Sequence, residues 1–191
     1  MTSEGPFGRS DRHAPVKGGP DAPGAAPAPH PQDQWLLLEN QLCFPFYAVS
    51  RLITRAYQSL LEPLGLTYPQ YLVMLALWEA DGVPIQHLSD RLLLNTNTLT
   101  PLLKRLESSR LVTRRREDSD ERVVIIRLTE EGRSLKEEAR RVPESLVEQL
   151  IGEGGQGAKG DDSPVMSPEQ LLELRESVKT FLAVLKDKAP S

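Results

Sequence analysis

The stretch from Ile85 to Leu128 constrains the fold most, because two short helical patterns are followed there by two β-branched segments. Residues 85–92 form the first helical pattern, and residues 98–109 form the second, with Asn95 or Thr96 as its cap. The second pattern carries one apolar stripe, made of Leu99, Leu102, Leu103 and Leu106. Two short helices joined by a tight turn, with Lys104 and Arg105 opposite the stripe, predict a helix-turn-helix.

Residues 111–128 predict a β-hairpin. Leu111–Arg115 and Arg122–Leu128 have the composition of strands, and the polar segment 116–121 separates them. A hairpin directly after a helix-turn-helix is typical of a winged helix, here residues 82–128. The expected fold class is therefore mainly α with a small β-wing.

The winged-helix segment also differs from the rest of the chain in charge. From Gly82 to Leu128 there are nine Lys and Arg against six Asp and Glu, a net charge of +3 within a chain of net charge −4. A basic segment in an acidic protein favours an anionic partner, with nucleic acid as the first candidate. An ordinary solvated surface is the alternative.

Further helices flank this segment and complete one expected domain over residues 34–188. The first lies within residues 36–61 and becomes regular near Cys43 or Phe44, since Pro45 is tolerated only in a first turn. Thr67 caps a second helix that has Pro69 in its first turn, and Thr129 caps a long helix over 129–151, kinked at Pro143.

A flexible loop is expected over 152–166 and a last helix over 167–187, with an apolar stripe of Leu171, Leu174, Val178, Phe181 and Leu185. The first and last of these helices, 36–61 and 167–187, have apolar faces that little else in the chain would cover. We therefore expect the chain to dimerise through the helices over 36–61, 129–151 and 167–187.

Several protein classes are disfavoured. Residues 1–33 hold seven of the sixteen prolines and few large apolar residues, so we expect a disordered tail. A single cysteine excludes a disulfide framework and a cysteine-based zinc cluster, and His87 is the only histidine outside the tail. No apolar run approaches the ~18 residues that span a bilayer. We expect a cytoplasmic protein that is not an enzyme and has no metal, no cofactor and no membrane contact.

The order of elements and four strings resemble the MarR family of bacterial transcription regulators, and within it the single-cysteine type of the organic hydroperoxide-sensing OhrR branch. The strings are Leu38–Phe44 (LENQLCF), Leu66–Tyr71 (LTYPQY), Leu99–Glu107 (LTPLLKRLE) and Asp118–Arg122 (DSDER). The resemblance covers roughly residues 36–150. Asn95-Thr96-Asn97 departs from the acidic residue, serine and glycine usual in this branch, so operator preference is expected to differ. Pro45-Phe46 is bulkier than usual.

The resemblance implies that Cys43 is a redox-sensing residue. Cysteine near a helix start favours the thiolate, which a hydroperoxide oxidises to sulfenic acid. The resemblance also implies that Tyr57 and Tyr68 donate hydrogen bonds to this sulfur across the dimer, with Tyr47 nearby. The plainer alternatives are a buried cysteine that acts as a small hydrophobe and tyrosines that only pack.

The second short helix should lie in the major groove of DNA and the wing in the minor groove. The resemblance implies that Arg122 enters the minor groove and is held by Asp120; the alternative is an exposed ion pair. Arg114, Arg115 and Arg116 are expected to contact the phosphate backbone. The groove-facing polar residues of the helix are Thr96, Asn97, Thr98, Thr100, Lys104 and Arg105.

These expectations combine into a homodimeric repressor that releases a pseudo-palindromic DNA operator when an organic hydroperoxide oxidises Cys43, with a low-molecular-weight thiol as the second reactant. One alternative is a MarR-type repressor released by a small phenolic or aromatic ligand. Another is a single-cysteine peroxidase, which would need an activating arginine or histidine beside the thiol, and no such motif is visible.

Overall fold

The computed structural model describes residues 30, 32–117, 120, 122–151 and 166–188. Most of the expected tail, 1–33, and most of the expected loop, 152–166, lie outside these residues, although Asp33 of the tail begins a 3-10 turn. The chain divides into two compact units, residues 1–44 and 45–191. In the first unit, two 3-10 turns, Asp33–Leu36 (η1) and Leu38–Asn40 (η2), precede the regular helix α1 (Cys43–Leu61). As predicted, α1 becomes regular at Cys43, because Pro45 then falls in its first turn.

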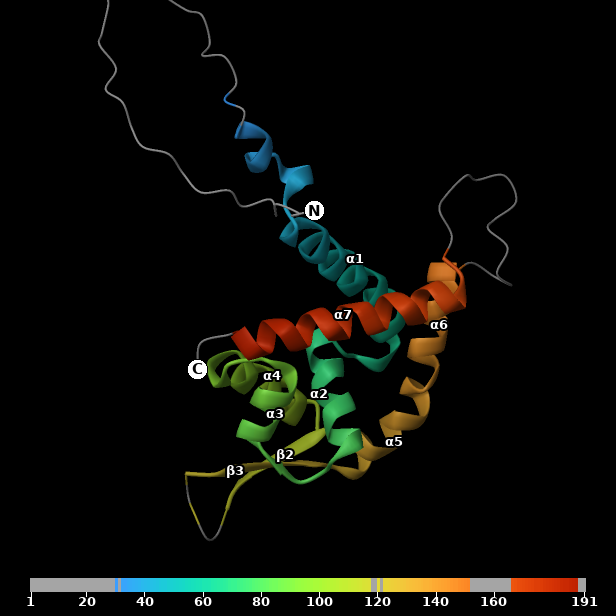
Figure 1. The fold of residues 1–191 in the computed structure, drawn as a ribbon. Helices are drawn as coiled ribbons and strands as arrows, with labels where there is room; N and C mark the ends of the chain where they lie inside the picture. Colours follow the sequence, from blue (N-terminus) through green and yellow to red (C-terminus); the bar gives the residue numbers. More distant parts are fainter. Residues whose placement is uncertain (1–29, 31, 118–119, 121, 152–165, 189–191) are drawn as a thin grey trace, which may run out of the picture. The chain divides into compact units, whose positions relative to one another are not determined.

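The second unit contains the rest of α1 and the elements that follow it (Figure 1). In Figure 1 the arm formed by β2 and β3 projects from a lobe that contains α2, α3 and α4, and α7 crosses α1. The elements after α1 are η3 (Glu62–Leu64), α2 (Tyr68–Glu79), β1 (Val83–Pro84), α3 (Ile85–Leu92), α4 (Thr96–Ser108), β2 (Val112–Arg116), β3 (Val124–Leu128), α5 (Glu130–Ala139), α6 (Arg141–Ile151) and α7 (Pro168–Lys188).

Local hydrogen bonds explain where the helices begin. Thr67 caps α2, as the sequence predicted, and the structure adds that Gln70 completes a capping box with it. The Asn95 side-chain oxygen accepts a hydrogen bond from the Thr98 N–H at 2.8 Å. This cap starts α4 at Thr96, two residues earlier than predicted.

The hairpin belongs to a three-stranded antiparallel sheet in the order β1-β3-β2. β2 and β3 pair in register from Val112 opposite Leu128 to Arg116 opposite Val124. The sequence predicted the hairpin but missed β1, which pairs with β3 through Val83 and Pro84. Two residues are too short for a period-two pattern, and one is a proline, which is tolerated only at a sheet edge.

The core lies where α2, α3, α4 and the sheet meet. Its fully buried apolar side chains include Leu88, Leu99, Leu103 and Leu106 of the helix pair, together with Val73, Met74, Leu77, Val112 and Ile126. Leu102, predicted to lie on the same stripe of α4, is half-buried. The winged-helix segment therefore shares one continuous core with α2, and this core extends to Leu61 at the end of α1 and to Ala139 at the end of α5.

The start of α5 is attached closely to this lobe. The Trp78 indole N–H donates to the Gly132 carbonyl at 2.8 Å, and a Cβ on Gly132 would lie 2.0 Å from the Leu111 carbonyl oxygen. The Asp81 carboxylate accepts hydrogen bonds from the Leu128 N–H at 2.8 Å and from the Arg133 guanidinium at 2.9 Å. These contacts join α2, β3 and α5.

The long helix expected over 129–151, with a kink at Pro143, is in fact two helices. α5 begins after Thr129, whose hydroxyl caps Gly132 as predicted, but it ends at Ala139, and α6 starts at Arg141. Pro143 has no N–H to donate to the carbonyl of Ala139, and its ring clashes there. The chain therefore breaks about one turn before the proline, which then lies in the first turn of α6.

α1 and α7 keep large apolar side chains exposed. On α7 only Leu171 and Phe181 of the predicted stripe are half-buried, and the Phe181 ring stacks on Phe46 of α1 with centroids 5.1 Å apart. The exposed residues of these helices include Val49, Leu52, Leu174, Val178, Leu182 and Leu185. None of the described helices is long and apolar enough to cross a membrane.

Candidate functional site

Cys43 is exposed and is the first residue of α1. The Phe44 N–H donates to the Gln41 carbonyl at 3.2 Å, and Pro45 has no N–H. The first turn therefore offers fewer unpaired N–H groups to a thiolate than the sequence argument assumed. Hydrogen-bond donors from elsewhere would have to contribute to stabilising an ionised sulfur.

Two of the three predicted tyrosines lie together. The rings of Tyr57 on α1 and Tyr68 on α2 stack with centroids 4.6 Å apart, and Tyr71 lies 5.8 Å from Tyr57. Tyr47 is not in this cluster: it is exposed, and the Arg51 guanidinium lies 6.0 Å from its ring centroid. Reasoning from the sequence missed Tyr71 because its spacing on α2 assigns it to the core, where it is indeed buried.

The tyrosine cluster, Tyr57, Tyr68 and Tyr71, has unused hydroxyl groups. Within the described residues none of the three hydroxyls has a hydrogen-bond partner, and that of Tyr71 is buried. Burial, followed by the neighbouring Tyr68 and Tyr71, raises the pKa of Tyr57 to about 12. Burial also raises the pKa of Tyr68 and of Tyr71, the latter with a contribution from Tyr68. All three phenols stay neutral near pH 7 and can donate to an anionic acceptor.

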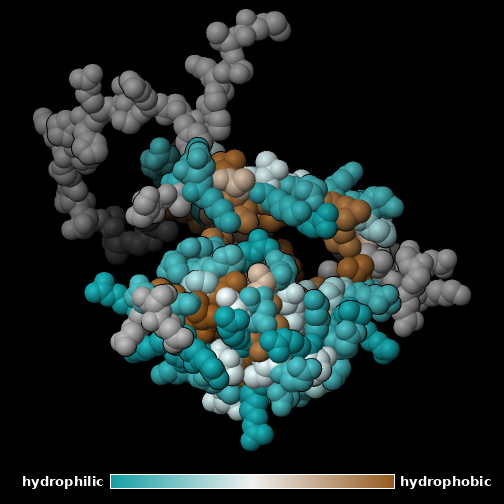
Figure 2. All heavy atoms as spheres, turned by 90° about the horizontal axis from the view of Figure 1, so that it is seen from below, coloured by the Kyte–Doolittle hydropathy of each residue, from teal (hydrophilic) through white to brown (hydrophobic). Residues whose placement is uncertain are grey.

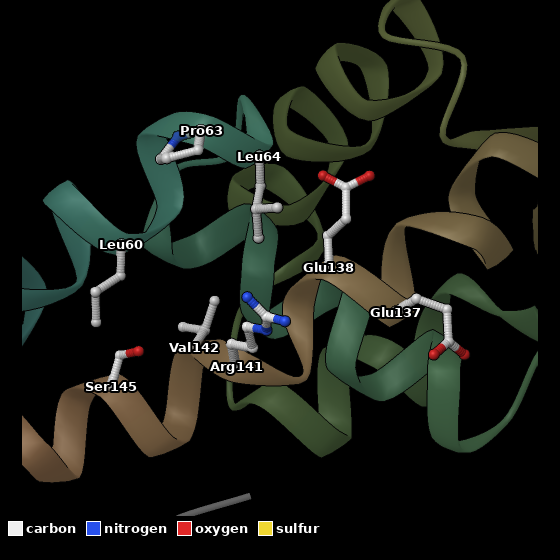
Figure 3. Close-up of a pocket in the computed structure, with 8 residues that line it drawn as sticks. All are labelled: Leu60, Pro63, Leu64, Glu137, Glu138, Arg141, Val142 and Ser145. Carbon is white, nitrogen blue, oxygen red and sulfur yellow. The ribbon is translucent and has the colours of Figure 1, made fainter.

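Two grooves lie near these elements. One, of about 460 Å³, is lined by Tyr68, Thr54, Gln58 and residues of the turn between α1 and α2. The other, of about 580 Å³, lies between the end of α1 and the α5–α6 break, and the side chains of Leu60, Leu64, Arg141 and Val142 line it (Figure 3). It contains none of the predicted site residues.

The predicted recognition helix, α4, presents its polar residues outward. Thr96, Asn97, Thr98, Lys104 and Arg105 are exposed, whereas Thr100 is half-buried. Figure 2 views the molecule from the side on which the hairpin lies in Figure 1, and that face is mainly hydrophilic. His87 of α3 is also exposed. Across the described ranges, no cluster of three or more His, Cys, Asp or Glu side chains could hold a metal ion.

The wing divides its arginines into two groups. Arg114 is half-buried: its N–H donates to the Glu107 carboxylate at 3.2 Å, and its guanidinium lies 3.7 Å from the same side chain. Arg115 and Arg116 are exposed at the end of β2. At the tip, the Asp120 carboxylate accepts a hydrogen bond at 3.0 Å from the main-chain N–H of Arg122. Asp120 therefore holds the backbone of Arg122, and residues 118, 119 and 121 lie outside the described part.

A short helix pair packed on α2, followed by a paired hairpin with a basic strand, defines a winged helix-turn-helix DNA-binding protein. The family described as "Transcriptional regulator SarA/Rot" matches residues 55–139. The organic hydroperoxide resistance transcriptional regulator of Bacillus subtilis (strain 168) is 42% identical over 151 residues, which cover 79% of this chain and 93% of that protein.

Two solved structures of AbfR, a protein of Staphylococcus epidermidis, are also similar. Reduced AbfR bound to DNA is 36% identical with a TM-score of 0.60, and overoxidised AbfR bound to DNA is 38% identical with a TM-score of 0.59. Each match covers 81% of this chain and 98% of the AbfR chain. This chain belongs to the MarR family of DNA-binding transcriptional regulators. It is a regulator and not an enzyme.

Proposed function

We propose that this chain is a homodimeric, cytoplasmic repressor that loses its operator when an organic hydroperoxide oxidises Cys43. The observation that carries the proposal is the placement of Cys43, the only cysteine of the chain, exposed at the first residue of α1. Two kinds of relatives support it: one is named for organic hydroperoxide resistance, and another has been solved on DNA in reduced and overoxidised forms.

The chemistry needs only the thiolate and the hydroperoxide. The thiolate sulfur attacks the terminal oxygen of the hydroperoxide, the O–O bond breaks, and an alcohol leaves after taking up a proton. Cys43 then carries a sulfenic acid, which condenses with a low-molecular-weight thiol to give a mixed disulfide and water. With one cysteine per chain, the capping sulfur must come from a small thiol or from another copy.

The tyrosine cluster supplies the donors that the helix start lacks. Tyr57 and Tyr68 are held side by side and neutral, and neither hydroxyl has an acceptor among the described residues. We propose that they donate to the Cys43 thiolate of a second copy, brought close when the apolar faces of α1 and α7 dimerise. A thiol adduct on Cys43 would enlarge this packed site and shift α1. Release of DNA needs a coupling free energy of roughly 1–3 kcal/mol between the oxidised site and the DNA-binding elements.

DNA binding in this proposal uses α4 in the major groove and the wing in the minor groove of each half-site. The main-chain N–H of Arg122 donates to the Asp120 carboxylate, and this hydrogen bond preorganises the backbone that carries the Arg122 side chain. Arg122→Ala should weaken operator binding by about 1–3 kcal/mol, the size of a specific contact. Asp120→Ala should act in the same direction without unfolding the protein, because both residues are exposed.

The decisive experiment compares wild type with Cys43→Ser on a labelled operator duplex isolated from a random pool. Cumene hydroperoxide with a small thiol should release wild type, and dithiothreitol should restore binding. Cys43→Ser should bind the duplex equally well and stay bound, because a serine hydroxyl cannot reach the sulfenic state. Release of Cys43→Ser by the hydroperoxide would overturn the proposal. Release of both proteins by a phenolic ligand, with no effect of peroxide, would favour a ligand-gated regulator.

A further inference from the structure

The outer face of α4 has Asn97 at its N-terminal end. At helical spacing, Asn97, Pro101, Lys104 and Ser108 share the side of α4 opposite the buried Leu99, Leu103 and Leu106. Asn97 is exposed, and Lys104 follows it two turns later on the same face. Asn97 therefore lies on the surface that would enter a major groove, on the same side as a cationic residue suited to the flanking phosphates.

The hydroxyl groups of this helix are mostly occupied within it. The Thr98 hydroxyl donates to the Asn95 side-chain oxygen at 2.9 Å, and the Thr100 hydroxyl donates to the Thr96 carbonyl at 2.7 Å. The Ser108 hydroxyl donates to the Lys104 carbonyl at 2.9 Å. These side chains hold the helix, and their donors are not available to a base.

The side-chain amides of α3 and α4 and of their connecting turn differ in whether the fold already uses them. The Asn95 oxygen caps α4, and the Gln86 amide donates to Asp90 at 2.8 Å. Among the described residues, the Asn97 carboxamide has no hydrogen-bond partner. Asn97 therefore offers an adjacent donor and acceptor that its own fold does not use. In addition, Pro101 has no N–H to give to the Asn97 carbonyl four residues earlier, so the main chain adds acceptor capacity at the same place.

A free carboxamide on this face matches one base edge. Adenine presents the N7 acceptor next to the N6 donor in the major groove, and an asparagine side chain pairs with both. Guanine presents two acceptors there, so the Asn97 oxygen would face another oxygen, and cytosine or thymine offers only one complementary group. A phosphate would use only the donor, and Lys104 and Arg105 serve phosphates better because they are charged.

We propose that Asn97 is a specificity-determining residue that reads one adenine in each half-site of the operator through a bidentate hydrogen bond. The proposal rests on the placement of α4 in the major groove under the proposed function, but it does not depend on peroxide sensing. Because the protein would bind as a dimer, the same adenine should occur twice, related by the operator's symmetry.

The test selects operators from a random duplex pool with fully reduced wild type, Asn97→Ala and Lys104→Ala, with no peroxide present. The wild-type consensus should contain one symmetric adenine that Asn97→Ala no longer selects. Replacing the adenines with 7-deazaadenine removes the N7 acceptor alone and should weaken wild type at least fivefold, since a bidentate pair is worth about 1–3 kcal/mol. Asn97→Ala should bind the normal and the modified duplex equally.

Lys104→Ala is the matched control on the same face. It should lower affinity for all sequences alike, reduce the salt dependence of binding and retain the adenine preference. If Asn97→Ala were poorly folded, Asn97→Asp provides a second readout: a carboxylate only accepts, so the selected base should change to cytosine.

Two results would overturn the proposal, and they are distinguishable. If Asn97→Ala selects the same adenines as wild type, or loses affinity equally for all sequences, Asn97 does not read a base. If Asn97→Ala, Lys104→Ala and Arg105→Ala all bind as wild type does, α4 does not contact DNA, and that part of the proposed function fails as well.

Discussion

The lobe formed by α2, α3, α4 and the sheet uses apolar residues similar to those of the α1–α7 pair. The two regions bury these residues to very different extents. In the lobe, Leu88, Leu99, Leu103 and Leu106 are completely buried. On α7, Leu174, Val178, Leu182 and Leu185 keep 40–49% of their surface exposed. The lobe is covered by its own chain, whereas no described segment covers the exposed faces of α1 and α7. The difference teaches that the winged helix buries its apolar residues within one chain, while we propose that a second copy covers the faces of α1 and α7.

The largest expected effect is a core truncation in the lobe. Leu103→Ala should lower the free energy of unfolding by roughly 2–5 kcal/mol, because it leaves a cavity in a fully buried site. Leu182→Ala on α7 is the matched control and should cost much less in dilute solution. Urea unfolding followed by circular dichroism, at several protein concentrations, measures both. Equal losses in the dilute samples would mean that the two regions are equally self-sufficient.

A charge on the exposed face of α7 should act on association. Val178→Asp would bury an unpaired carboxylate if this face meets a second copy, and should weaken dimerisation by roughly 100-fold or more. Thr180→Asp, on the opposite side of α7, should leave it unchanged. Sedimentation equilibrium gives the dissociation constants. Unchanged dimerisation of Val178→Asp would show that the apolar face of α7 is not the interface.

Removing the buried hydroxyl of Tyr71 tests whether this residue belongs only to the lobe or also to the proposed dimer interface. If this hydroxyl has no acceptor in the functional state, Tyr71→Phe should raise the free energy of unfolding by about 1 kcal/mol, because a buried unpaired donor is unfavourable. Tyr68→Phe, which changes a half-buried ring, should be nearly neutral. A loss of stability in Tyr71→Phe would mean that the dimer supplies an acceptor, and that the cluster belongs to both regions.

The smallest effect concerns the attachment of α5 to the lobe. Burial raises the pKa of Asp81, but hydrogen bonds from Leu128 and Arg133 outweigh it and hold the pKa below its usual value. Because the folded-state pKa is the lower one, the stabilisation is present above the ordinary value of 3.8 and is lost as the pH falls through the folded-state pKa. Wild type should therefore exceed Asp81→Asn in stability at pH 6, and the gap should close in acid. A gap that persists at pH 2 would exclude the carboxylate as its cause.

Much of the fold was predictable because local chemistry decided it. Several predicted features depend only on residues within a few positions of one another. They are the Thr67 and Thr129 caps, the start of α1 at Cys43 and the apolar stripe of α4. Prediction failed where the cause was distant or too short to form a pattern. β1 exists only because β3 lies beside Val83 and Pro84. The break between α5 and α6 lies about a turn before Pro143, where the missing hydrogen bond falls.

The candidate site divides in the same way. The sequence by itself determined the inventory: one cysteine, a helix-turn-helix with a wing, and polar residues along the outer face of α4. Only the tertiary structure decided which groups are free to act. In the folded chain Tyr57 stacks on Tyr68, with the unpredicted Tyr71 beside them. The hydroxyls of Thr98 and Thr100 are hydrogen-bonded there, whereas the Asn97 side chain has no partner among the described residues. The reason is physical: residue type fixes what a side chain can donate or accept, but its availability depends on neighbours that only the folded chain brings within hydrogen-bond distance.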